Sequence, residues 1–274
     1  MIPKIIHYCW FGGNPKPDDV KKYIASWRQY CPDYEIREWN EENFDVNENA
    51  YCREAYEAKK WAFITDYVRL KALYEFGGFY MDTDVEVVKS LDPLRVYDAV
   101  SGYESPTHIP TGTMGACRDN EWIGMLLHNY DNRHFLKSDG SFDLTTNVKV
   151  ITDLTTEKYG LELHGQKQCF GNNMILLPFD YLCAKDMNTG EEKVTSNTFT
   201  IHHFSGSWLP KETRIYVDIF HHYHEKYRKM GFPEFIAFQL TRISTAYAQG
   251  GVSYIFKKLY KKYKKVNCKM NLNR

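Results

Sequence analysis

The chain has 274 residues, of which 43% are apolar, 26% are charged and 16% are aromatic, a composition that excludes an intrinsically disordered protein. Its formal charge is zero, but 12 Lys/Arg and only 2 Asp/Glu lie in the segment 225–274. That segment therefore carries +10 and residues 1–224 carry −10, so the acidic larger part lacks the basic field that nucleic acid requires.

The spacing of the cysteines and the lengths of the apolar segments indicate in which cellular compartment the protein is found. The seven cysteines are scattered and form no CxxC pair, which is typical of reduced thiols rather than of a disulfide framework or a zinc site. The N-terminus lacks the apolar core of a secretory signal, and no segment approaches the ~20 apolar residues of a membrane span. We therefore expect a cytoplasmic protein.

Strand and helix patterns alternate in the first part of the chain. Runs of apolar and β-branched residues predict strands over 2–10, 34–39 and 79–81. Apolar residues at helical spacing predict helices over 15–30 and 51–76. This alternation is typical of an α/β domain with a parallel sheet, which binds ligands at the carboxyl ends of its strands.

The second part of the chain is less regular. We predict strands over 99–103, 174–178 and 198–202, a helix over 120–130, and either a helix or a strand over 147–155. No repeat or low-complexity linker interrupts the sequence.

We predict one α/β domain over 1–214 and a helical, basic extension over 215–274. Within the extension, the stretch FKKLYKKYKKVNCKM places aromatic and aliphatic residues among lysines. It could be a solvated helix, or an amphipathic polybasic segment that lies on an anionic lipid surface.

The stretch LYEFGGFYMDTDVEVV places Asp82 and Asp84 at the carboxyl end of an apolar strand. Residues i and i+2 of a strand point to the same face, so the two carboxylates repel each other. A solvated turn would tolerate that repulsion. A buried strand end would require a divalent cation, and Mg²⁺ and Mn²⁺ prefer carboxylate oxygen.

Three further groups of residues can each be interpreted in two ways. Asp66 and Arg69 share one helix face, either as a weak surface pair or as a buried pair that binds sugar hydroxyls or phosphate. Trp10 ends the first strand, where it could pack in the core or stack on a nucleobase. The stretch TIHHFSGSW, residues 200–208, could be structural, or could donate an imidazole to a metal from a closing loop.

Three blocks resemble, in this order, the DXD-containing glycosyltransferases of family 32: IPKIIHYCWFGG, FITDYVRLKALYEFGGFYMDTDVEVVKSLDPL and HHFSGSW. That family is found in capsular and surface-polysaccharide synthesis. It is distantly related to yeast outer-chain mannosyltransferases and to glucosylating toxins. The resemblance implies a GT-A fold, a mostly parallel nucleotide-binding sheet flanked by helices. It also implies Mn²⁺ or Mg²⁺ at the DXD, and hexose transfer with retention from a nucleotide sugar, with a UDP-sugar favoured by the toxin-like features.

The resemblance also implies roles for the donor-binding residues. Trp10 would stack on the base, and Asp66 and Arg69 would hold the ribose and the donor sugar. Tyr80 would line the donor pocket, and Asp82 would contact the ribose or reach the metal through water.

The remaining implied roles concern the metal and the leaving group. Asp84 would be the direct metal ligand, and His203 stands where the toxin relatives have a Glu ligand. Ser207 would complete the donor site, and Trp208 would lie over the glycosidic oxygen of the diphosphate. The expected catalytic set is therefore Asp66, Arg69, Asp82, Asp84 and Trp208.

The acceptor would be a glycan or a lipid-linked oligosaccharide, with 111–114 and 146–147 as candidates for the acceptor side. Two alternatives remain. Phosphatases of the haloacid dehalogenase type also place a DxD at a strand end, although Glu86 stands here where they carry Thr or Val. A non-catalytic module that binds nucleotide or glycan would keep the same residues without turnover.

Overall fold

The computed structural model describes residues 1–110, 112–206 and 211–251 of the chain. Predictions for Thr111, Ser207, Trp208 and the basic segment 252–274 lie outside these residues. The chain forms two compact units. The larger contains Met1–Lys185 and Glu192–Phe204, and the smaller contains Asp186–Glu191 and the described residues that follow Phe204.

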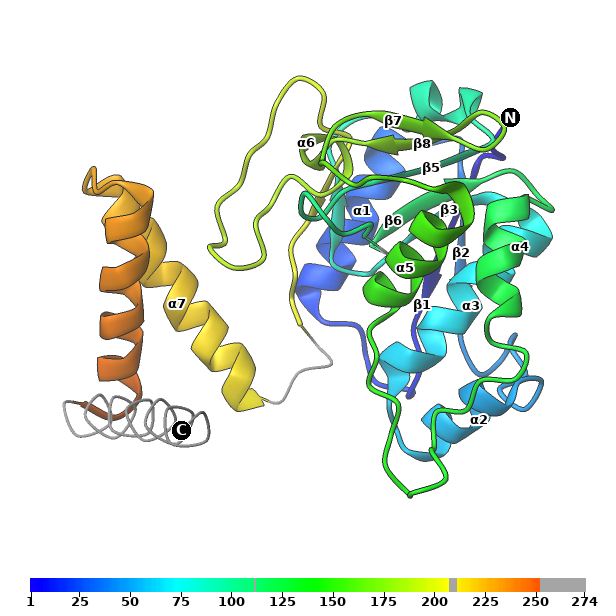
Figure 1. Cartoon of the computed structure of the whole chain (residues 1–274), viewed down its shortest axis with the longest axis horizontal. Helices are drawn as coiled ribbons and strands as arrows, with labels where there is room; N and C mark the ends of the chain where they lie inside the picture. The colour runs from blue at the N-terminus through cyan, green and yellow to red at the C-terminus, as the bar shows by residue number, and fades with distance from the viewer. Residues whose placement is uncertain (111, 207–210, 252–274) are drawn as a thin grey trace, which may run out of the picture. The chain divides into compact units, whose positions relative to one another are not determined.

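The larger unit is built on a seven-stranded sheet with the order β2-β1-β3-β6-β5-β8-β7 (Figure 1). Its strands are β1 (Ile5–Cys9), β2 (Glu35–Trp39), β3 (Gly78–Met81), β5 (Ala99–Gly102), β6 (Thr113–Ala116), β7 (Gln168–Phe170) and β8 (Met174–Leu177). β6 and β7 run antiparallel to their neighbours, and the other strands of this sheet share one direction. The predicted α/β architecture, a mostly parallel sheet flanked by helices, is confirmed.

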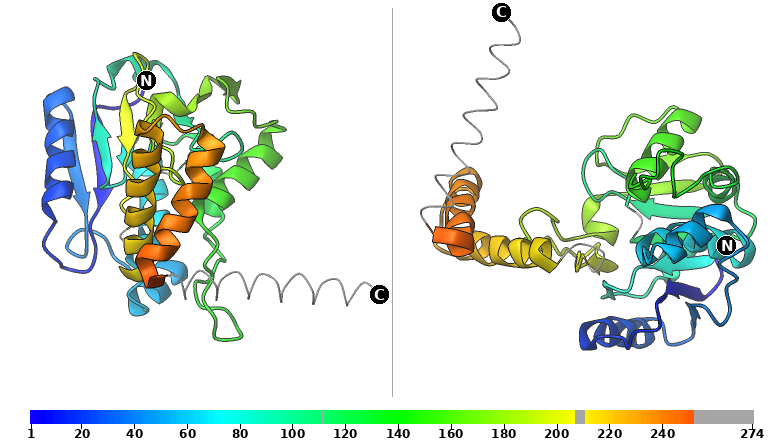
Figure 2. Two further views of the ribbon diagram at one scale, coloured as in Figure 1. Left: turned by 90° about the vertical axis from the view of Figure 1, so that its left-hand side faces the viewer. Right: turned by 90° about the horizontal axis from the view of Figure 1, so that it is seen from below.

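Helices cover both faces of this sheet, and each face has its own apolar core. The helices are α1 (Asp18–Tyr30), α2 (Ala50–Glu57), α3 (Trp61–Phe76), α4 (Glu121–His128), α5 (Asn147–Tyr159) and the short α6 (Phe179–Leu182), with a 3₁₀ turn η1 (Asp92–Val96). Side chains of α2 to α5 form one core cluster, and α1 packs into the other on the opposite face (Figure 2). The segment 147–155, left open by its sequence, is helical.

β3 is the strand that delivers the DXD. Gly77 and Gly78 precede it with φ angles of 64° and 104°, in the region that favours glycine. A Cβ at Gly78 would lie 2.6 Å from the carbonyl oxygen of Ile5 in β1, so the two strands require glycine there. All four residues of β3 are buried, and Asp82 therefore emerges directly from the core.

A second, two-stranded sheet pairs β4 (Val85–Val87) with β9 (Thr200–His202) in antiparallel register, with Val85 opposite His202. The sequence predicted β9 but not β4. α1 fixes β4, because the indole Nε1–H of Trp27 donates to the carbonyl of Val85 at 2.8 Å. The amide of Val87 donates to Ser26 Oγ at 2.9 Å.

The smaller unit consists mainly of α7 (Lys211–Lys229) and a second helix over 234–251. The two helices contact each other through the rings of Phe220 and Phe238, 5.5 Å apart. The hydroxyls of Tyr227 and Ser244 are hydrogen-bonded at 2.6 Å. Among the described residues, no helix is both long and apolar enough to cross a membrane.

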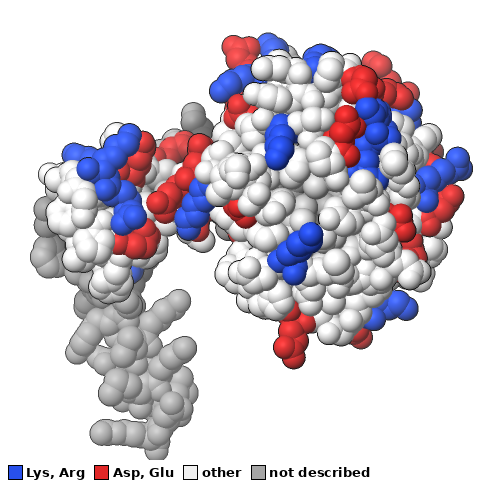
Figure 3. Space-filling view, turned by 90° about the horizontal axis from the view of Figure 1, so that it is seen from above, with Lys and Arg blue, Asp and Glu red and all other residues white. Residues whose placement is uncertain are grey.

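Acidic and basic side chains are intermixed on the face of the larger unit that Figure 3 shows.

Candidate active site

The DXD lies in a tight turn at the carboxyl edge of the main sheet. The backbone amide of Asp82 donates to the carbonyl of Gly112 at 2.9 Å, which ties the end of β3 to the start of β6. The amide of Val85 donates to the carbonyl of Asp82 at 3.0 Å. This turn brings the side chains of Asp82 and Asp84 to the same edge.

Arg69 connects the helix α3 to the DXD. Its Nη2 lies 3.2 Å from Asp66 Oδ1 and 3.3 Å from Asp82 Oδ1. Its guanidinium lies over the ring of Tyr80 at 4.5 Å, and the hydroxyl of Tyr80 donates to Asp82 Oδ1 at 3.0 Å. The side chains of Arg69 and Asp66 are only 5% and 12% exposed, so the interpretation as a solvated surface pair is excluded.

Burial governs the ionisation of this cluster. Burial raises the pKa of Asp66 to about 7, against the opposing effect of the Arg69 cation. Burial also disfavours the charged form of Arg69, but Asp82, Tyr80 and Asp66 offset it and raise the pKa of Arg69. The site therefore keeps a fixed positive charge next to a carboxyl group that can gain or lose a proton near neutral pH.

Asp82, Asp84 and His202 form a group that could hold a metal ion, because their ligand atoms all lie within 4.8 Å of one another. His202 Nε2 lies 3.3 Å from Asp84 Oδ1. Burial disfavours the protonation of His202, yet Asp84 offsets it, and the pKa of His202 rises well above its ordinary value. The Asp84 carboxylate thus favours positive charge at this point. Two carboxylate oxygens and an imidazole nitrogen suit Mn²⁺ and Mg²⁺.

The structure brings His202 to this group in place of His203, which the sequence suggested as the third ligand. Neighbouring residues of a strand point to opposite faces, so only one of the two can face the DXD. His203 instead stacks on Tyr23, with ring centroids 4.6 Å apart. Its Nε2 lies 2.9 Å from Glu86 Oε2.

Glycine at position 112 makes room for His202. A Cβ on Gly112 would lie 2.7 Å from His202 Nδ1, closer than real side chains approach. The sequence placed Gly112 only within 111–114, as a candidate for the acceptor side, because its contact with His202 depends on β6 lying next to β9 and the DXD turn.

Glu104 is a further acidic residue at this edge that the sequence analysis missed. It follows β5, which runs in the same direction as β3, so both strands end at one edge of the sheet. Burial raises the pKa of Glu104, with His202 and His108 opposing and Asp82 adding to the effect. The strand order alone brings Glu104 near the DXD.

Trp10 also lies at this edge, directly after β1, and its side chain is only partly buried. Its indole Nε1–H donates to the carbonyl of Asn14 at 2.7 Å, and Lys16 Nζ lies 5.9 Å from its ring. The stacking of Trp10 on a nucleobase stays a prediction.

Asn147, a candidate for the acceptor side, is buried at the start of α5. Burial raises the pKa of Asp66, and the side chain of Asn147 partly opposes that rise.

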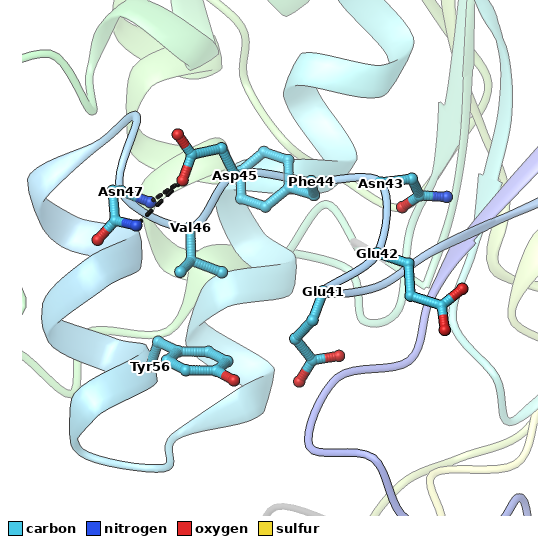
Figure 4. Close-up of a pocket in the computed structure, with 8 residues that line it drawn as sticks. All are labelled: Glu41, Glu42, Asn43, Phe44, Asp45, Val46, Asn47 and Tyr56. Carbon is cyan, nitrogen blue, oxygen red and sulfur yellow. Dashed lines mark hydrogen bonds between the residues drawn. The ribbon is translucent and has the colours of Figure 1, made fainter.

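A pocket after β2 contains none of the predicted site residues (Figure 4). It is lined by Glu41, Glu42, Asn43, Phe44, Asp45, Val46, Asn47 and Tyr56. Three of these side chains are carboxylates, which repel a diphosphate. The Arg69 cluster differs because it contains a buried cation and a group of ligand atoms that could hold a second one.

Residues 17–101 match the family model described as a glycosyltransferase sugar-binding region containing a DXD motif. The match covers 85 of the 274 residues, and over this part the chain is similar to that family. The matched residues include α3 with Asp66 and Arg69, and the whole DXD turn, so the resemblance seen in the sequence is confirmed.

Similar proteins include yeast enzymes and a solved structure. The chain is 30% identical over 146 residues to inositol phosphoceramide mannosyltransferase 3 of Schizosaccharomyces pombe, covering 49% of this chain and 40% of that protein. It is 30% identical over 147 residues to the mannosyl phosphorylinositol ceramide synthase SUR1 of Saccharomyces cerevisiae, covering 50% and 37%. The match thus spans less than half the length of these relatives. The structure of PaToxG glycosyltransferase aligns with a TM-score of 0.43 and 19% identity over 57% of this chain and 69% of that one.

Proposed function

We propose that this protein is a metal-dependent glycosyltransferase that moves a hexose from a nucleotide sugar to a glycan or lipid-linked acceptor. One observation carries the proposal. Inside the matched family region, Arg69 contacts Asp66 and Asp82 at the sheet edge, and His202, from outside that region, lies at the same edge beside Asp84.

The residues suit the departure of a nucleoside diphosphate, which gains negative charge as the glycosidic bond breaks. A divalent cation held by Asp82, Asp84 and His202 would stabilise that charge. Arg69 adds a second, permanent positive charge in a region shielded from water, where electrostatic stabilisation is strongest. Asp66, when ionised, can accept hydrogen bonds from hydroxyls of the donor sugar.

The names of the yeast relatives describe mannosyl transfer to inositol phosphoceramide, which supports a hexose donor and a lipid acceptor here. We retain UDP-sugars as the first donors to test, with GDP-mannose beside them. We also propose retention at the anomeric carbon by front-face attack of the acceptor hydroxyl. Trapping of a covalent glycosyl-enzyme would overturn that mechanism.

We further propose that the protein works in surface or capsular polysaccharide synthesis at the inner face of the cell membrane. The support is the charge of the segment 225–274, which carries 12 Lys/Arg and 2 Asp/Glu and suits an anionic lipid surface. Deletion of 252–274 should weaken binding to anionic vesicles and leave donor hydrolysis intact. Unchanged binding after the deletion would contradict this role of the basic segment.

Hydrolysis of the donor in the absence of acceptor tests the central proposal. The full chain is incubated with a panel of UDP- and GDP-sugars and Mn²⁺, and the released nucleotide is measured. We expect release from one donor, loss of release with EDTA, and loss in Asp84→Asn. Donor binding without release in any condition, including with lipid acceptors, would assign a binding module instead. Turnover of p-nitrophenyl phosphate that depends on Asp82 would assign a phosphatase.

A further inference from the structure

The connection between α4 and α5 contains a short β-hairpin rather than an irregular loop. Leu136 and Phe142 face each other in an antiparallel bridge. Two backbone hydrogen bonds flank the bridge, from the amide of Lys137 to the carbonyl of Ser141 at 2.8 Å, and from Asp143 to Phe135 at 2.7 Å. We call residues 133–144 the 133–144 hairpin.

Buried contacts hold the base of this hairpin. Arg133 pairs with Asp143 at 2.7 Å, and both side chains are at most 15% exposed. The guanidinium of Arg133 also lies over the ring of Tyr51 at 4.9 Å. Phe135 is fully buried and contacts the ring of Phe63 in α3 at 4.8 Å. The hairpin is therefore fixed to the α2–α3 side of the sheet.

The outer face of the hairpin is apolar. Leu136, Phe142 and Leu144 are 47%, 39% and 61% exposed. The flanking hydrogen bonds make Leu136 and Phe142 a non-hydrogen-bonded pair, which shares a face with Leu144 by strand alternation. The ring of Phe142 also stacks on the buried ring of Phe135, with centroids 5.0 Å apart, so only part of Phe142 faces solvent. We call these three side chains the apolar tip.

The apolar tip lies at the same edge of the sheet as the DXD. α3 returns the chain from β2 to the parallel β3, so it runs against the strands and begins at their carboxyl ends. Consistent with this, a Cβ on Gly12, just after β1, would lie 2.8 Å from the ring of Trp61. Phe63, which holds the hairpin, is in the same first turn of α3. Figures 1 and 2 show the hairpin, in green, projecting at this end of the sheet.

We propose that the apolar tip inserts into the surface of a lipid bilayer and thereby turns the DXD edge toward a membrane-borne acceptor. This inference rests on the proposed function, because it assumes a lipid-linked acceptor. Such an acceptor presents its sugar or headgroup at the bilayer surface, so the edge that holds the donor must face that surface.

Size and charge favour lipid over a protein partner. Three partly exposed side chains cannot supply the ~800 Å² per partner that a stable protein interface buries. Within the hairpin, Arg133 and Asp143 neutralise each other, and Lys137 and Asp139 have opposite signs. The carboxylate of Glu54 in α2 accepts from the amide of Leu136 at 2.9 Å and contacts His134 at 2.7 Å, so it adds no basic charge to the tip. Binding through the tip should therefore depend on apolar insertion rather than on anionic lipid. This distinguishes it from binding through the basic segment, which requires anionic lipid and weakens in salt.

Vesicle flotation of the full chain tests the inference. The variant Leu136→Ser/Phe142→Ser/Leu144→Ser is compared with wild type on phosphatidylcholine vesicles in high salt. The matched control is Val96→Ser/Val194→Ser, which removes side chains that are 59% and 52% exposed elsewhere on the same unit. We expect wild type and control to float, and the tip variant to lose about 10-fold in vesicle partitioning.

Hydrolysis of the soluble donor, thermal unfolding and the oligomeric state of each variant complete the experiment. Hydrolysis should be unchanged in the tip variant, and Leu144→Ser alone should give a smaller loss of partitioning with an unchanged melting temperature. Equal flotation of the tip variant and wild type, or no flotation of wild type on neutral vesicles, would overturn the inference. So would a dimer that dissociates in the tip variant, because it would assign the tip to self-association. Absence of hydrolysis in every variant would contradict the proposed function, and flotation would still be read independently.

Discussion

His202 Nε2 lies 3.3 Å from Asp84 Oδ1, across the antiparallel pair that β4 and β9 form. Its neighbour His203 faces Glu86 on the other side of the strand. The sequence had favoured His203 as the third ligand, whereas this geometry favours His202, and the variants of the two histidines are a matched pair.

We expect His202→Ala to weaken Mn²⁺ binding by at least about 10-fold, because it removes one of the three groups that converge on the candidate metal site. His203→Ala should leave Mn²⁺ affinity nearly unchanged. Titration calorimetry or the electron paramagnetic resonance signal of free Mn²⁺ measures both variants. A larger loss in His203→Ala would return the ligand role to His203.

Gly112→Ala should disturb the same site without a change in charge. The added methyl group would lie 2.7 Å from His202 Nδ1, so the imidazole must move away from the carboxylates. We expect weaker Mn²⁺ binding and a near-normal melting temperature. In a His202→Ala background, Gly112→Ala should have no further effect on Mn²⁺ affinity. An equal loss in both backgrounds would show that the glycine acts on something other than the histidine.

Asp66 should make the protein less stable as the pH rises. Its pKa is about 7 in the folded state, above the ordinary value of 3.8, so the native state holds an extra proton between these values. The free energy of unfolding therefore falls as pH rises through that window, by up to a few kcal/mol. Asp66→Asn cannot ionise and should show a shallower fall between pH 5 and 8 in urea unfolding. Asp131→Asn, at an exposed position, controls for loss of a carboxylate, and identical slopes in all three proteins would refute the assignment.

His7 should make the protein less stable as the pH falls, which is opposite to the effect of Asp66. Its Nε2–H donates to the carbonyl of Gly77 at 2.8 Å, and its Nδ1 accepts from the indole N–H of Trp39 at 3.1 Å. Burial lowers the pKa of His7 to about 4, so the unfolded chain binds the extra proton between about 4 and 6.5. Stability from this group is complete above pH 6.5 and is lost as pH falls toward 4.

His7→Gln keeps a donor and an acceptor but does not titrate, so its melting temperature should fall less than that of wild type between pH 6.5 and 4.5. His7 and Asp66 act in opposite directions in this range, and each must be compared with its own variant. A His7 ring that titrates near pH 6.5 in the folded protein, followed by NMR, would contradict the assignment.

Sequence patterns predicted the elements whose residues carry a strong local signal. β1, β3 and α3 are apolar along most of their length, and the segment Gly77-Gly78 marks the boundary between helix and strand. The two Asp residues of the DXD and the pair Asp66–Arg69 could be found for the same reason, since each lies within one such element or at its end.

The remaining parts of the site depend on pairing between distant segments. β4 and β6 have three and four residues, too few for a periodic pattern, and β6 contains a glycine. The choice between His202 and His203 depends on the register of β9 against β4, which no local pattern reports. Gly112 and Glu104 become part of the site only through the order of the strands.

The pairing of β4 with β9 also has a consequence for how the protein acquires its activity. It joins residue 85 to residue 202, so it closes a long stretch of chain and is expected among the last contacts to form. Asp82 and Asp84 follow β3, whereas the imidazole of His202 arrives only with the final strand of the larger unit. A chain still emerging from the ribosome, or one cut before β9, therefore has the two carboxylates but an incomplete candidate metal site, and tight metal binding would be a signature of completed folding.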